Sequence, residues 1–169
     1  IAGCSVTTQW DDWKELQAHL HRGGEYGYYW KNPGKQSEWW KVGAPAGVPT
    51  TRKNIYFGVH PTGIIPSTNA KGELKEPAGV RSQIGVIAAI NCVFAEFDAK
   101  HWDGGKEAII NHLNAIPLEP SVIIDSGGGY HAYWLLDKPF LLQSDADRQR
   151  ARYIQQAWVK WVQSDDDAK

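Results

Sequence analysis

Apolar and polar positions along the chain follow two periodicities, one typical of helices and one typical of strands. Apolar side chains recur at helical spacing over Lys106–Ala115 and Asp145–Val162. A third helical stretch follows Thr8, which is a suitable capping residue and is followed by acids in the first turn. The glycine pair at 23 and 24 is expected to end this helix.

Runs rich in aromatic and β-branched residues predict strands between these helices. The predicted strands are Tyr26–Trp30, Asn54–His60, Asn91–Asp98, Ser121–Asp125 and Tyr130–Leu136. Residues 32–41 are interpreted as a polar connection, 61–77 as a long loop and 81–90 as a segment with a short helix. From residue 91 onward the order is strand, helix, strand, turn, strand, helix. This order predicts an α+β fold with helices packed on one face of a sheet.

Composition narrows the classes of function. The chain has 169 residues, of which 42% are hydrophobic and 22% charged, which suits one globular domain with its own core. The net charge of −1 provides no global positive field, so contact with nucleic acid requires a local basic patch. Two cysteines, Cys4 and Cys92, are too few for a disulfide framework or a cysteine zinc site, and we expect a cytoplasmic protein.

The ends of the sequence indicate a piece of a longer protein. There is no methionine in the chain, and it stops at Lys169, soon after a helical pattern. No signal peptide is visible, and no apolar run reaches the roughly twenty residues of a membrane span. We expect residues 1–169 to form a single domain without a membrane partner.

Two carboxylates in the strand 91–98 are the first candidates for chemistry. Glu96 and Asp98 are two residues apart, so both side chains point to one face of the strand, while Val93, Ala95 and Phe97 point to the other. The apolar neighbours favour a central strand, where paired like charges need a cation between them. We interpret the pair as ligands of a divalent metal. A structural ion pair or the wet face of an edge strand is the alternative.

A glycine run about thirty residues later leads into a single histidine. Ser126, Gly128 and Gly129 belong to a predicted turn whose backbone N–H groups suit phosphate oxygens, and His131 follows on a strand. We interpret these four residues as a phosphate contact, and a flexible hairpin with an incidental histidine is the alternative. Tyr133 shares the face of His131 and is expected in the core.

Arg81 and Lys100 are the best candidates among the basic residues, because short connections join them to the carboxylate strand. Both are expected to contact the phosphate-bearing ligand of this site. The nine tryptophans are suited to stacking on bases, although most are expected to serve as packing residues.

These residues resemble the motifs of the archaeo-eukaryotic primases, the primase-polymerases of phages, prophages and plasmids. Phe94–Asp98 resembles the first motif of that family, two acids flanking one residue on a core strand. Asp125–Trp134 resembles the second, a turn of small residues that leads to a histidine on a strand. Asn54–Pro61, with Arg81 ahead of the first motif, resembles the lead-in of prophage-type members. The resemblance covers roughly residues 50–165.

The resemblance implies an RRM-like sheet, antiparallel or mixed, with flanking helices and an N-terminal α/β extension. It also implies primer synthesis and extension on a DNA template, from nucleoside triphosphates, with two Mg²⁺ or Mn²⁺ ions. Glu96 and Asp98 would be metal ligands, and His131 would contact the triphosphate. Tyr56 and Tyr133 are candidate gates for the sugar.

The resemblance also implies a third motif, an acid on a strand after the long helix, and this motif is missing before Lys169. Asp165, Asp166 and Asp167 resemble the loop ahead of it. The helicase domain that often accompanies such a domain is also missing from this sequence, and a helicase domain or protein is therefore expected as a partner. Two alternatives therefore stay open: a non-catalytic nucleotide- or nucleic-acid-binding module, and a metal-dependent nuclease.

Overall fold

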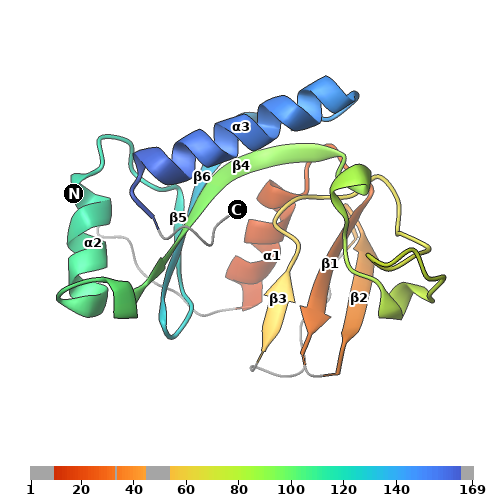
Figure 1. Cartoon of the computed structure of the whole chain (residues 1–169), viewed down its shortest axis with the longest axis horizontal. Helices are drawn as coiled ribbons and strands as arrows, with labels where there is room; N and C mark the ends of the chain where they lie inside the picture. Colours follow the sequence, from red (N-terminus) through yellow and green to blue (C-terminus); the bar gives the residue numbers. More distant parts are fainter. Residues whose placement is uncertain (1–9, 33, 45–53, 165–169) are drawn as a thin grey trace. The chain divides into compact units, whose positions relative to one another are not determined.

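The computed structural model of the chain describes residues 10–32, 34–44 and 54–164 (Figure 1). Within these residues the fold is α+β, as predicted, with three α-helices and two three-stranded sheets. The described chain divides into two compact units. The C-terminal unit comprises 92–137 and 144–164, and the N-terminal unit comprises the described part of 10–91 together with 138–143. Thr8 and the three acids Asp165–Asp167 lie outside the described residues.

The C-terminal unit consists of a three-stranded sheet and two helices. In chain order the elements that lie wholly or mostly in this unit are β4 (Ala89–Asp98), α2 (Gly105–Ala115), β5 (Val122–Asp125), β6 (Gly129–Leu141) and α3 (Asp145–Trp161). Ser144 and Asp147 form a capping box that starts α3. The strands lie in the order β4-β6-β5, and β5 pairs antiparallel with β6.

One face of this sheet packs against the helices, as the alternation predicted. Val93, Ala95 and Phe97 of β4 are 6%, 0% and 2% exposed, and they join Ile109 and Leu113 of α2 in one core cluster. Burial of the valine, phenylalanine, isoleucine and leucine side chains contributes about 1.5–3 kcal/mol each. The side chains of Val93, Ala95 and Phe97 therefore lie in the core, and those of the alternate residues of β4 point to the opposite face of the sheet.

The prediction that the Glu96 strand is central was wrong. Within the described residues β6 is the central strand of the C-terminal unit, and β4 lies at an edge. The outer edge of β4 is nevertheless not bare, because the side-chain amide of Gln155 in α3 bonds both backbone groups of Phe94. Phe94 N–H donates to Gln155 Oε1 at 3.3 Å, and Gln155 Nε2 donates to Phe94 O at 2.7 Å.

The N-terminal unit has a second small sheet. Its elements are α1 (Trp10–Leu20), β1 (Tyr26–Lys31), β2 (Gln36–Lys41) and β3 (Ile55–Phe57), with the antiparallel strand order β2-β1-β3. The interpretation of residues 32–41 as a connection was wrong, because Gln36–Lys41 is β2. Trp39 stacks on Tyr28 across the strand pair at 4.6 Å, and Trp40 lies 5.6 Å from His21, so both faces of β2 hold an aromatic residue.

The remaining segments follow the predictions in outline. Residues 61–88 are irregular, apart from isolated bridges and the short 3₁₀ turns η1 (Pro77–Gly79) and η2 (Ile84–Val86). The short helix expected in 81–90 is thus a single turn, and β6 continues five residues beyond its predicted end at Leu136. Among the described residues, no helix combines the length and apolar character needed to cross a membrane.

Candidate functional site

The sheet face opposite the helices of the C-terminal unit carries the predicted site. Its polar end is a hollow of about 140 Å³. The hollow is lined by Glu96, Phe97, Asp98, His101, Ser126, Gly128, Gly129 and His131. The structure therefore gathers both carboxylates, the histidine and the three turn residues that the sequence indicated, although about thirty residues separate the two groups in the chain.

Asp98 is held by the residue two positions later. Lys100 Nζ lies 2.6 Å from Asp98 Oδ2, and the Lys100 backbone N–H donates to Oδ1 at 3.2 Å across the 3₁₀ turn η3 (Ala99–His101). The side-chain hydrogen bond from Lys100 is the main cause that lowers the pKa of Asp98, followed by the backbone bond. Asp98 is thus a carboxylate at neutral pH. Lys100 contacts this residue of the hollow, and its expected contact with the nucleotide stays a prediction.

The glycine turn is held tightly against the end of β4. Gly127 takes a left-handed backbone conformation with φ of 91°. Ser126 N–H donates to Gly129 O at 3.0 Å, and Ala99 N–H donates to Gly128 O at 3.0 Å. A Cβ on Gly129 would overlap the carbonyl of Phe97, so only glycine allows this approach. Within the described residues, the Gly128 N–H has no acceptor, and Gly128 lines the hollow.

Asp125 and Lys106 fix the turn from its other side. Lys106 Nζ of α2 lies 2.6 Å from Asp125 Oδ1, and the same oxygen accepts from the Gly127 N–H at 2.7 Å. These bonds, the one from Lys106 first, lower the pKa of Asp125. Lys106 also lies 5.4 Å above the ring of Tyr130. This support was not predicted from the sequence, although an aspartate two residues ahead of a glycine is a known turn signal.

His101 is a second histidine of the hollow that the sequence analysis missed. It follows β4 on η3 and contributes to the lowered pKa of Asp98 through its charge. His131 lies opposite Ile124 in the β5–β6 pair and is partly buried. Two imidazoles and two carboxylates therefore line the same hollow.

The apolar end of the same face is closed. Tyr133 is 1% exposed and stacks on Phe94 at 6.1 Å, so its predicted place in the core is confirmed. Burial, more than the nearby Cys92 and Glu96, raises the pKa of its hydroxyl. Tyr133 does not line the hollow, and this disfavours its use as a sugar gate.

Arg81 and Tyr56 belong to the N-terminal unit. The Arg81 guanidinium lies 5.5 Å above the Trp30 ring, and Tyr56 is 53% exposed on β3. The expected contact of Arg81 with the nucleotide stays a prediction.

The described residues contain no complete group of metal ligands. No three side chains of His, Cys, Asp or Glu in 10–32, 34–44 and 54–164 are grouped as a metal-binding set. Glu96 and Asp98 offer hard oxygen donors of the kind that Mg²⁺ and Mn²⁺ prefer. The donors that complete such a set were expected among Asp165, Asp166 and Asp167 or beyond them.

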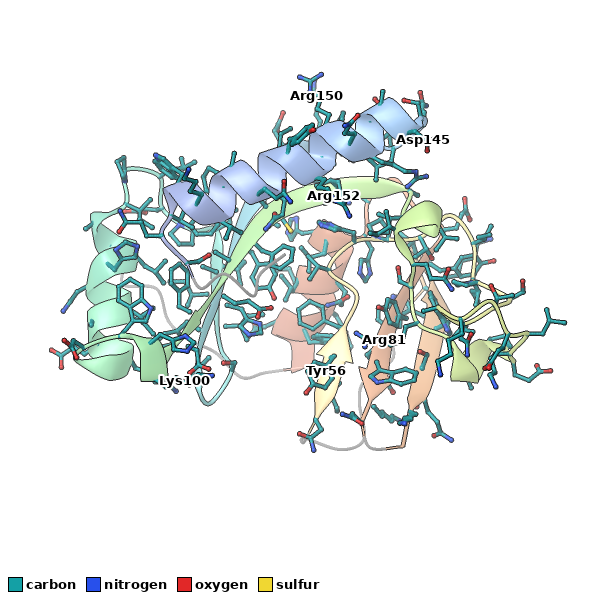
Figure 2. All side chains as sticks on the ribbon, in the orientation of Figure 1. Tyr56, Arg81, Lys100, Asp145, Arg150 and Arg152 are labelled. Atoms are coloured by element: carbon teal, nitrogen blue, oxygen red, sulfur yellow. The ribbon has the colours of Figure 1, made fainter. Side chains whose placement is uncertain are left out.

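A larger hollow of about 400 Å³ lies on the outer surface of α3. It is lined by Ala146, Gln149, Arg150, Tyr153, Ile154 and Ala157. Figure 2 shows Arg150 pointing away from the sheet. This lining has neither a carboxylate nor a histidine, so its size does not make it a catalytic site.

Comparisons with known proteins add no family to this description: no protein-family model matches the chain, and neither does any curated protein or solved structure.

Proposed function

We propose that the chain is the catalytic domain of a DNA primase-polymerase, which transfers nucleotides to a growing primer on a DNA template in the replication of a phage, prophage or plasmid. The observation that carries the proposal is the shared hollow of Glu96, Asp98, His131 and the Gly128 turn. Two carboxylates beside a glycine turn and a histidine offer one site both to divalent metal and to the phosphate oxygens of a metal-bound triphosphate.

The topology of the C-terminal unit supports the RRM-like form of the fold. β6 lies between β4 and β5, which are joined through α2, and this is the split arrangement of a β-α-β-β-α-β unit. In such a unit a strand after the second helix lies beside the first strand. Gln155 occupies the edge of β4 at Phe94, so an added strand would pair with the part of β4 that carries Glu96 and Asp98. An acid on that strand would lie beside the two carboxylates.

The proposed roles of the residues follow from their present contacts. Glu96 and Asp98 hold divalent metal, and Asp98 exchanges its ion pair with Lys100 for this contact, which releases the Lys100 ammonium toward phosphate. His131, Ser126 and the Gly128 N–H bind the triphosphate oxygens. When bound, Mg²⁺ or Mn²⁺ activates the attacking 3′-hydroxyl and neutralises the leaving pyrophosphate. The chain itself supplies position and charge, which are the main requirements of this chemistry.

Primer extension by the full-length protein tests the proposal. With a primed DNA template, nucleoside triphosphates and Mg²⁺ or Mn²⁺, Asp98→Asn and Glu96→Gln are each expected to lower the rate at least about a hundredfold. His131→Ala is expected to raise the KM for the nucleotide. Asp103→Asn is the matched control, because Asp103 is an exposed carboxylate that does not line the hollow. Normal extension by Asp98→Asn would refute the assignment.

A non-catalytic nucleotide-binding module is the second candidate. It is favoured by one observation, the ion pair that occupies Asp98 in a site with only two described acids. Metal-dependent nucleotide binding without any extension product from the full-length protein would select this function over the first.

A further inference from the structure

The sheet of the N-terminal unit has two unlike faces. One face packs against α1, where Trp13 meets Phe57 at 5.2 Å and His21 lies beside Trp40. The carboxylate of Glu38 is on this face and is bonded by Tyr29 and Lys31. The strand residues of the opposite face are Tyr26, Tyr28, Trp30, Ser37, Trp39, Lys41 and Tyr56. This opposite face is thus mainly aromatic and has no acidic strand residue.

The middle of the aromatic face is covered by the segment that leads to Arg81. Trp39 Nε1 donates to Pro77 O at 2.9 Å, and Ser37 Oγ donates to the carbonyl of Val80, which is fully buried. Arg81 follows directly, and its guanidinium is carried over the Trp30 ring at 5.5 Å. These bonds place one cation at the Trp30 end of the sheet.

Tyr56 completes an open platform at this end. It is the Cα partner of Trp30 across β1 and β3, so the two rings share a face. Tyr56 is 53% exposed, and Arg81 is exposed as well. Figure 2 labels Tyr56 on β3 and also labels Arg81, and Trp30 links the two as the strand partner of Tyr56 and the ring below Arg81. A tyrosine ring and a guanidinium plane on a tryptophan form a surface to which flat rings with a nearby negative charge are suited.

We propose that Tyr56, Trp30 and Arg81 form a binding platform for single-stranded DNA. A base stacks on the Tyr56 ring, and Arg81, held by Trp30, binds the adjacent phosphate. Duplex DNA is disfavoured because its bases are already stacked on one another. The inference rests on the proposed function only in the choice of DNA as the occupant. It uses none of Glu96, Asp98 and His131, and it gives Arg81 a template phosphate as its partner in place of the nucleotide expected from the sequence.

Fluorescence anisotropy of a labelled oligothymidylate of about 20 nucleotides tests this platform with the 169-residue chain. The buffer contains EDTA and no nucleotide, so the result does not depend on catalysis. Tyr56→Ala is expected to raise Kd by about fivefold or more, and Tyr56→Phe, which keeps the ring, to leave it within about twofold. Arg81→Ala is expected to reduce the salt dependence of binding by about 0.7 in the logarithmic slope.

Tyr153→Ala is the matched control, because Tyr153 is a similarly exposed tyrosine, 60% accessible, on α3. It is expected to bind as the unaltered chain does. The proposal is refuted if Tyr56→Ala and the unaltered chain bind oligothymidylate with equal affinity. It is also refuted if the unaltered chain does not bind oligothymidylate, or if it binds duplex DNA more tightly. Asp98→Asn is expected to bind oligothymidylate normally, so loss of extension by that variant and loss of binding by Tyr56→Ala report on separate claims.

Discussion

At Gly129 the two strands that carry the candidate site come so close that a side chain has no room. The glycine lies against the Phe97 carbonyl, between Glu96 and Asp98 of β4, and it starts the strand that carries His131. The spacing of the carboxylates and the histidine therefore depends on one missing side chain.

Gly129→Ala is expected to destabilise the fold by about 2 kcal/mol or more, because the added methyl group overlaps backbone atoms that cannot move freely. Gly128→Ala is the control. A Cβ at Gly128 meets no atom within 4 Å, so its effect is expected to stay within about 0.5 kcal/mol. Urea unfolding followed by circular dichroism measures both. Equal stability of the two variants would contradict the close approach.

Single residues of the site could be predicted only where a local rule applies. The common face of Glu96 and Asp98 follows from strand alternation, and the turn follows from its glycines. Lys106 and His101 could not be found in this way, because their places depend on how α2 and the η3 turn meet the sheet.

At the scale of elements, the feature with the clearest consequence is the protected edge of β4. Strand edges with unpaired backbone groups favour association with other chains. Here the side-chain amide of Gln155 takes the place of a neighbouring strand at Phe94. It accepts a hydrogen bond from the Phe94 N–H and donates one to the Phe94 carbonyl. This contact allows an apolar strand to lie at an edge of the described sheet.

Gln155→Leu is expected to cost about 1–3 kcal/mol in the free energy of unfolding, because a part-buried N–H and C=O lose their partners. It is also expected to increase self-association, measured by analytical ultracentrifugation. The neighbouring Gln156→Leu, at an exposed position of α3, is the matched control. If the two leucine variants unfolded at the same urea concentration, the edge contact would have no stabilising role.

Most elements could be predicted because their patterns are local. The helices α2 and α3 begin within one residue of the predicted positions, and their capping and glycine signals are short-range. The strand β2 was missed because its two adjacent tryptophans break the polar-apolar alternation. The edge position of β4 was missed because strand order depends on pairings between distant residues.

At the scale of the whole molecule, each of the two units has its own proposed surface. The C-terminal unit has the hollow of Glu96, Asp98 and His131, and the N-terminal unit has the platform of Tyr56, Trp30 and Arg81. Metal-bound triphosphate at the first and single-stranded DNA at the second are what a template-directed polymerase needs. The central claim concerns the first surface, because the proposed nucleotide transfer is assigned to it.

Paramagnetic broadening of amide signals in the nitrogen-15 spectrum of the chain tests that claim most directly. Trace Mn²⁺ is added with a non-hydrolysable nucleoside triphosphate, and excess Mg²⁺ serves as the competitor. The account predicts that the signals of Glu96–Asp98 and Gly128–His131 disappear first, that those near Tyr153 on α3 persist, and that Mg²⁺ or Asp98→Asn restores the lost signals. Broadening that spares the hollow, or that is unchanged in Asp98→Asn, would contradict it.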